Sequence, residues 1–293
     1  MASEMKVSAK CIETSRQWTD EKEDITVPGG VYLCQVSESV SCGSCCGLYN
    51  VANFSRDALV NTLEKRTYEF STVSREVSEI IRFGEMVSQQ IRNNQPFPEF
   101  HHCPFVGLIG NELSRVGCLL HPMAEGNTGI DFRGLSYYGG MACRIYFCSV
   151  NRHLPDRIKK IVRACFDDWY SYGLIITESS LLAAIFHEIE TRLENPVYLE
   201  MISPEALSKI YRLLTLKLNW RFRSPQWPIV NYFFEDRKYR PPVIDYQTIQ
   251  LKPSRYHAIL QELGSTFSCA QAMHQAEAIL NSQFEAVIEN ISP

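Results

Sequence analysis

Eleven cysteines, unevenly distributed, constrain this 293-residue chain more than any other feature of its sequence. Eight of them fall within residues 34–148, whereas the final 145 residues contain only Cys165 and Cys269. At 11 of 293, about 3.8%, cysteine is too sparse for a disulfide scaffold, and the chain is long enough to bury a core without such cross-links. An odd number also fits poorly with complete pairing. The cysteines are therefore the residues from which a function can be inferred.

The N-terminal sequence predicts a cytoplasmic protein. It reads MASEMKVSAK, without the apolar stretch of a secretory signal peptide, and no run approaches 18 consecutive apolar residues. In a reducing compartment, clustered thiols bind metal more often than they form disulfides. The formal net charge of −4 shows no global basic excess, so we expect neither nucleic acid nor a membrane as the partner.

The pattern of residue types divides the chain near residue 150. We expect a cysteine-cluster metal-binding domain over 31–150 and a helical domain over 151–293. Within the first domain, apolar periodicity predicts helices near 55–66 and 74–92, and weak alternation predicts a short strand at 31–36. The remainder, rich in Gly, Pro, His and Cys, is expected to be turns and short strands. In the second domain, helical spacing predicts helices near 155–172, 178–194, 204–219, 254–263 and 267–290.

These elements predict a mainly α fold, in which an irregular, turn-rich cysteine-cluster domain packs against an α-helical C-terminal half. The cysteine-rich part shows few periodic apolar runs, so we expect it to have little core of its own. Metal cross-links would then hold its irregular backbone together. Cys165 and Cys269 are expected to be buried helix residues without metal.

The sequence Cys42-Gly-Ser-Cys45-Cys46 is the strongest single signal. Two thiolates separated by two small residues can converge on one metal from a tight turn. The adjacent Cys46 is harder to interpret, because neighbouring side chains tend to diverge. The pair Cys45 and Cys46 could serve different metals, bridge one cluster, or include one structural thiol.

Further cysteines come from the segment that follows, as the looser pair Cys143-x4-Cys148 and as single residues. Each alone is weak evidence, since a lone cysteine commonly packs as a small hydrophobe. Together they favour metal ligation over redox thiols or core packing. The candidate metal ligands are Cys42, Cys45, Cys46, Cys103, Cys118, Cys143 and Cys148.

The order of these elements resembles the YkgJ-like cysteine-cluster family, described as zinc- or iron-chelating. The resemblance covers residues 42–148 and rests on CGSCCG at 42–47, Cys103-Pro-Phe, Gly117-Cys118, and Cys143-Arg with Cys148. It implies that the seven cysteines are metal ligands. The chain departs from the family pattern in having Ser39 where a further cysteine is frequent, His-Pro in place of Arg-Pro at 121–122, and an insertion at about 123–140.

The number of thiols leaves the identity of an eighth ligand open. Four thiolates hold one structural zinc ion or one [4Fe–4S] cluster, so seven exceed one such site and fall one short of two. Cys34 and His121 are both candidates, although an exposed loop position is the ordinary interpretation of His121. For His101 and His102, surface or supporting roles are expected rather than ligation.

The adjacent cysteine pair in a glycine-rich turn and the surplus of thiols favour a [4Fe–4S] cluster over zinc. We expect a metal-binding protein that serves electron transfer, metal handling or support of a modification reaction. One alternative is a zinc-stabilised module whose basic helical half binds a protein partner. Another is a methyltransferase-like modification enzyme, suggested by a weak resemblance to flagellin lysine methylases. Whether the protein is an enzyme stays open, because the sequence contains no CxxxCxxC, GxGxxG or P-loop motif.

In the zinc-stabilised alternative, the basic part of the helical half is residues 201–260, which carry ten Lys or Arg and four acidic residues. Aromatic residues are interleaved with the basic ones. Such a mixture could bind phosphates or an acidic partner. The interpretation we favour is a set of amphipathic helices with basic outer faces and an aromatic core.

Overall fold

The computed structural model describes residues 24, 26–92, 95–227 and 241–291, which form a mainly helical fold with one two-stranded sheet. These residues fall into two compact units. One comprises Leu33–Cys148 together with Asp168–Gly173, and we call it the cysteine unit. The rest belongs to the helical unit. The segment Asp168–Gly173, which the sequence pattern assigns to the helical half, thus groups with the cysteines. Most of residues 1–30 lies outside the described residues.

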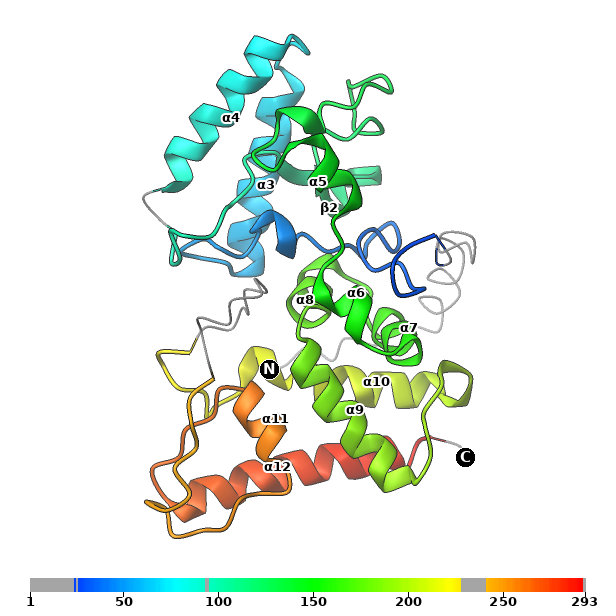
Figure 1. The fold of residues 1–293 in the computed structure, drawn as a ribbon, viewed down its shortest axis with the longest axis vertical. Helices are drawn as coiled ribbons and strands as arrows, with labels where there is room; N and C mark the ends of the chain where they lie inside the picture. Colours follow the sequence, from blue (N-terminus) through cyan, green and yellow to red (C-terminus); the bar gives the residue numbers. More distant parts are fainter. Residues whose placement is uncertain (1–23, 25, 93–94, 228–240, 292–293) are drawn as a thin grey trace. The chain divides into compact units, whose positions relative to one another are not determined.

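In the cysteine unit, two helices accompany a small antiparallel sheet (Figure 1). Helix α3 contacts strand β1, and Val106 of β1 pairs with Cys118 of β2. The expected strand at 31–36 is wrong, because the described residues there form only one isolated bridge, Gln35 to Ser41. A short helix, α5, forms where the sequence predicted turns. The bounds are α3 Arg56–Ser71, α4 Val77–Arg92, β1 Val106–Ile109, β2 Arg115–Cys118 and α5 Gly139–Ile145.

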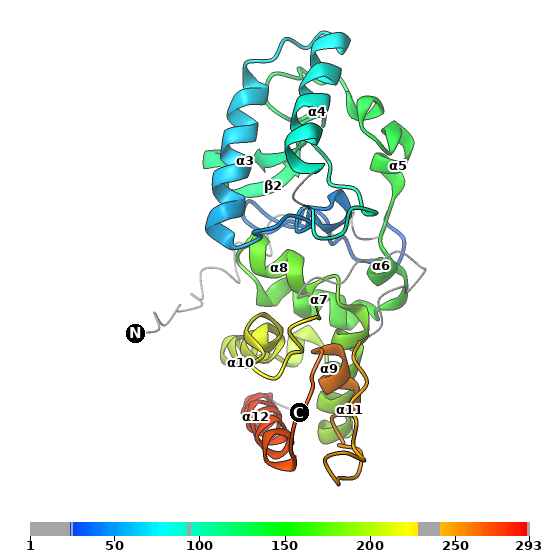
Figure 2. The ribbon, with the colours of Figure 1, turned by 90° about the vertical axis from the view of Figure 1, so that its left-hand side faces the viewer.

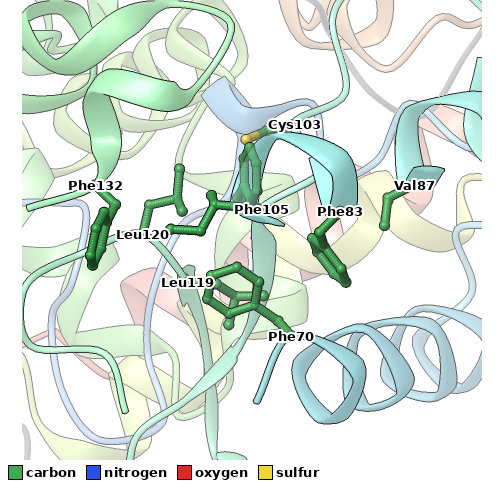
Figure 3. Close-up of a cluster of buried hydrophobic side chains, with 9 residues drawn as sticks. Phe70, Phe83, Val87, Cys103, Phe105, Leu119, Leu120 and Phe132 are labelled. Carbon is green, nitrogen blue, oxygen red and sulfur yellow. The ribbon is translucent and has the colours of Figure 1, made fainter. Parts of the chain in front are cut away.

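The cysteine unit has a substantial hydrophobic core, contrary to the expectation from its sequence (Figure 3). Helix α4 directs Ile80, Phe83 and Val87 into it at helical spacing. The ring centroids of Phe70 and Phe83 are 5.2 Å apart at a 61° interplanar angle, an edge-on arrangement that aromatic rings prefer. Single residues from turns and strands complete the core, and these carry no periodicity that a sequence pattern could reveal. Its buried members are Phe70, Ile80, Phe83, Val87, Cys103, Phe105, Leu119, Leu120 and Phe132.

The helical unit is built largely from helices that the sequence pattern predicts. Helix α12 packs on both α9 and α10, and α11 packs on α9 (Figure 2). Ser203 caps α10 as predicted, with its side-chain oxygen 3.1 Å from the backbone nitrogen of Ala206. The expected helix at 155–172 is instead two, because Phe166 is extended after α7. The bounds are α6 Ser149–His153, α7 Asp156–Cys165, α9 Ser179–Leu193, α10 Pro204–Thr215, α11 His257–Glu262 and α12 Ala270–Ile288. Helix α8, Trp169–Ile175, belongs to the cysteine unit as far as Gly173 and to the helical unit from Leu174.

The two cysteines of the C-terminal half differ in their surroundings. Cys165 is the last residue of α7 and is buried, as predicted. The prediction for Cys269 is wrong, because this residue is exposed. Its backbone is extended (φ −159°, ψ 162°) at the N-cap position, so it precedes the first turn of α12 and its buried stripe.

No single helix among the described residues is long and apolar enough to cross a membrane. Helices α8 and α9 reach that length and composition only as a pair, bent by 85°. Within α9, Leu181, Leu182 and Ile185 are buried.

Acid is expected to weaken the helical unit through the ion pair of Arg157 and Glu190. Burial raises the pKa of Glu190, but two hydrogen bonds from Arg157, at 2.8 and 2.9 Å, outweigh it and hold the pKa below its ordinary value. The stability from this pair is complete above the pKa of an unfolded glutamate, about 4.3, and is lost as the pH falls through the lower folded value. Urea unfolding between pH 3 and 7 should show a smaller fall in stability for Glu190→Gln, and equal slopes would contradict this.

Candidate metal centre

Two of the predicted ligands, Cys45 and Cys46, lie in a short 3-10 helix, η1, over Ser44–Cys46, and Cys42 lies two residues before it. The nitrogen of Cys46 donates to the carbonyl of Gly43 at 3.1 Å, and Gly47 ends the turn with φ +72°. A side chain on Gly47 would also overlap the carbonyl oxygen of His101. Only glycine satisfies both requirements, so the turn packs directly against the backbone of His101, two residues before Cys103. Cys45 is exposed, whereas Cys46 is half-buried.

Cys103 and Cys118 lie beside Cys46. The nitrogen of Cys103 donates to the carbonyl of Cys46 at 2.8 Å, and the buried Cys103 belongs to the hydrophobic core. Cys118 is the last residue of β2, opposite Val106, whose nitrogen donates to the carbonyl of Cys103 at 3.4 Å. Cys46 and Cys118 both pack against the core that contains Cys103.

The other cysteines of the unit come from two segments, Cys34 from before the turn and Cys143 and Cys148 from α5 and the residues after it. Cys143 is an exposed residue of α5 whose sulfur lies 3.1 Å from the hydroxyl of Ser136. Cys148 is half-buried and follows α5. Cys34 is half-buried, and its carbonyl accepts a hydrogen bond of 2.8 Å from the nitrogen of Cys42.

The pKa values of these thiols report their surroundings. The pKa of Cys42 and of Cys103 is raised to about 12, and that of Cys118 to about 11. Burial is the largest cause in each case. The side chains of Cys45 and Cys46 are hydrogen-bonded to each other. This bond lowers the pKa of Cys45 and raises the pKa of Cys46. A metal ion or cluster would have to displace the protons of the buried thiols, because only the thiolate is a ligand.

The predicted ligands come within electrostatic range of one another. Beyond the effect of burial, the charge of Cys118 raises the pKa of Cys103, and that of Cys143 raises the pKa of Cys118. Cys148 acts in the same way on Cys42. Within the described part of the chain, however, no three His, Cys, Asp or Glu side chains are gathered closely enough to hold a single metal ion.

The three histidines of this region have different roles. His102 is buried, and its Nδ1 lies 2.9 Å from the carbonyl of Gly47, so Nδ1 carries the proton. Its Nε2 then accepts from Arg66 at 3.1 Å. Burial and Arg66 lower the pKa of His102 to about 3, so the ring is neutral and supports the turn after Cys46. His121 uses its Nδ1 to accept from the nitrogen of Met123 at 3.1 Å.

His101 presents a buried polar atom to the same region. Its Nε2 has no hydrogen-bond partner among the described residues, while its ring stacks on Tyr137 with centroids 4.5 Å apart. The ring of Tyr138 is 5.1 Å away. Burial, followed by the charges of Tyr137, Cys45, Cys46 and Cys103, raises the pKa of Tyr138 to about 12. Tyr138, whose ring neighbours that of His101, is therefore within electrostatic range of these thiols.

Two arginines supply positive charge next to the thiols, and sequence reasoning missed both. Arg66, buried in α3, lowers the pKa of Cys103, and Arg133 lowers that of Cys118. Arg133 is held by Asp131, with Nη2 2.8 Å from Oδ2. No sequence spacing connects either arginine to a cysteine motif, since each is brought there by folding.

The basic stretch 201–260 does not present a uniform basic face where it is described. Lys217 is buried against Glu178, and Arg223 donates to the carbonyl of Lys217. Trp220 is also buried, and its indole nitrogen donates to Ser265 at 2.8 Å. These contacts favour amphipathic helices over a phosphate-binding surface. Residues 228–240 of the stretch lie outside the described residues.

Compared with known proteins, the chain has no significant match to a protein-family profile, to a curated protein or to a solved structure.

Proposed function

We propose that this protein is an iron–sulfur protein that holds a [4Fe–4S] cluster through cysteines of the cysteine unit. The proposed ligands are Cys42, Cys45, Cys46, Cys103, Cys118, Cys143 and Cys148. The observation that carries the proposal is that these residues, separated by up to 106 positions, belong to one compact unit, in which Cys103 is hydrogen-bonded through its backbone to Cys46 and both pack with Cys118 on one core.

The donor set suits such a cluster. All seven candidates are thiols, which are the usual ligands of [4Fe–4S] clusters, and four of them suffice for one such cluster.

The surroundings of the thiols also suit a thiolate-bound cluster. Arg66 and Arg133 offset negative charge near Cys103 and Cys118. The unpartnered Nε2 of His101 is a buried donor or acceptor that a cluster could satisfy, because the sulfurs of such clusters accept hydrogen bonds from the protein. The bound cluster would supply one-electron chemistry, while these residues set the charge and polarity around it.

The test is anaerobic isolation of the full chain, followed by analysis of iron, acid-labile sulfide and zinc, with an absorption spectrum. We expect brown protein with at least ~4 iron and ~4 sulfide per chain. Cys103→Ala should lose much of that iron, whereas the matched variant Cys165→Ala, a buried thiol of the helical unit, should retain it. Colourless protein with stoichiometric zinc would refute the proposal.

A further inference from the structure

The cysteine unit exposes an apolar surface on and beside α5. Seven of the fourteen large apolar side chains that are exposed in the described residues lie between residues 123 and 146. A single exposed apolar side chain is ordinary, whereas several on one element indicate an interface. We call five of them the α5 patch, which consists of Ile130, Tyr137, Tyr138, Met141 and Ile145.

Helix α5 contacts the rest of the unit through a close approach of two glycines. Gly140 lies against η3, a 3-10 helix over Arg133–Leu135, where an added Cβ would be 3.2 Å from the nitrogen of Gly134. No residue of α5 is buried, and α5 lies on the side of the unit away from α3 (Figure 2). Met141 and Ile145, one turn apart, are 77% and 64% exposed. Because so short a helix is marginal in water, its apolar face favours a covering surface.

Two tyrosines extend this face beyond the N-terminus of α5. The ring centroids of Tyr137 and Tyr138 are 5.1 Å apart, and Tyr137 also stacks on His101. Ile130 adjoins the same helix through its neighbour Asp131, which accepts a hydrogen bond of 2.7 Å from Arg144 of α5. Tyrosine and methionine are enriched at protein interfaces, so the composition of the patch is that of a contact surface.

The size of the α5 patch suits a stable dimer. At roughly 200 Å² for a large apolar side chain, its five partly exposed members present on the order of 600 Å². A standard interface takes about 800 Å² from each partner, of which roughly 65% is apolar in homodimers. The patch can therefore supply the apolar area of one side of such an interface.

The exposed apolar residues of α3 and α4 do not form a comparable surface. Tyr68 is next to Glu69, which pairs with Lys65 at 3.7 Å. Ile81 is next to Arg82, which pairs with Glu79 at 3.1 Å. Apolar side chains interspersed with charges in this way are ordinary features of a protein surface.

The charges around the α5 patch favour a second copy of the chain as its occupant. The segment 123–146 carries two acidic and two basic residues, so its net charge is zero. Asp131 accepts from both arginines, with its Oδ2 2.8 Å from Arg133 and 2.6 Å from Arg144. A neutral surface has no excess charge to attract an oppositely charged partner. Across a two-fold axis it also brings no excess of like charge together, and a second copy supplies the same apolar surface.

From this arrangement we infer that the protein is a homodimer in which two copies pack their α5 patches together across a two-fold axis. The candidate ligand Cys143 does not take part in this contact. It lies on the opposite side of α5 from Met141 and Ile145, with its sulfur beside Ser136. Dimerisation is thus a property beyond the proposed function and does not depend on it.

Sedimentation velocity of the full-length protein, kept anaerobic and reduced, tests the dimer. Reductant prevents the exposed Cys45, Cys143 and Cys269 from forming intermolecular disulfides. At micromolar concentrations the wild type should have twice the mass of one chain. Met141→Asp and Ile145→Asp should each raise the dissociation constant at least ~100-fold, because a two-fold interface contains each substitution twice and buries the carboxylates without partners. Far-UV circular dichroism should show both variants folded, since neither side chain belongs to the core.

The matched control is Val243→Asp, which adds the same charge at a side chain that is 82% exposed in the helical unit. This variant should dimerise as the wild type does, and so should the conservative variant Met141→Leu. Hydrogen exchange locates the interface, because the amides of residues 137–146 should be more protected at high protein concentration than at low concentration.

Several results would overturn the homodimer or its location. One is wild-type protein that stays monomeric at the highest concentration measured, and another is a dimer that both aspartate variants form with unchanged affinity. Equal dissociation by Val243→Asp would attribute the effect to added charge alone. Monomers that bind neutral phosphatidylcholine vesicles, and lose this binding in the aspartate variants, would assign the patch to a membrane surface instead. None of these results depends on iron or zinc content, so the proposed function is tested separately.

Discussion

Removal of the proposed cluster is expected to make residues 31–150 sensitive to protease before the helical residues 151–293. Outside its helices and small sheet, the described part of this region runs through turns. Ordering backbone costs about 1–2 kcal/mol per residue, whereas a structural thiolate–metal site contributes roughly 10–16 kcal/mol in small domains. That contribution is comparable to the whole net stability of a typical domain.

The hydrophobic core around Phe70 and Phe105 sharpens this prediction. Because α3, α4 and the sheet bury apolar side chains without metal, the first cuts should fall in the cysteine turns near residues 34–50 and 119–148. The measurement is limited proteolysis of the full chain before and after oxidative metal removal, with fragments mapped by mass. Cys103→Ala should behave as the stripped protein and Cys165→Ala as the loaded one. Equal protection in both states would show that metal does not hold this region together.

The substitution Lys217→Ala is expected to destabilise the helical unit by about 3–5 kcal/mol. Lys217 and Glu178 are each 3% exposed, with Nζ 2.5 Å from Oε1, and Nζ also donates to the carbonyl of Leu174 at 2.8 Å. The pKa of Lys217 is lowered by burial, which Glu178 partly offsets. Loss of the ammonium leaves the carboxylate of Glu178 buried without this cation, and a buried charge that loses its cation carries a large desolvation penalty.

Urea unfolding measures this effect, and the chain offers a matched control. Lys209 pairs with Glu205 at 3.8 Å where Glu205 is 68% exposed, so Lys209→Ala should cost no more than about 1 kcal/mol. The double variant Lys217→Met/Glu178→Leu should recover most of the lost stability, because it removes both charges and keeps the apolar volume. A cost below about 1 kcal/mol for Lys217→Ala would mean that water reaches the pair.

The correct sequence predictions are those that depend on neighbours along the chain. The spacing of Ile80 and Val87 predicted α4, and Ser203 followed by proline predicted the start of α10. Both signals are local, because a helix repeats every 3.6 residues and its cap bonds within one turn. The same reasoning failed at Phe166, where extended backbone divides one periodic stretch into two helices.

By itself, the sequence determined the mainly helical fold, most helix positions and the seven thiols offered as metal ligands. Only the tertiary structure decided that Cys34 joins Cys42, that Cys46 packs against the core that contains Cys103, and that Arg66 lies beside Cys103. It also decided that Lys217, one residue of a basic stretch, is buried. The physical reason is that these contacts join residues across loops and strand pairings, whose geometry depends on the whole core and leaves no periodic trace in the chain.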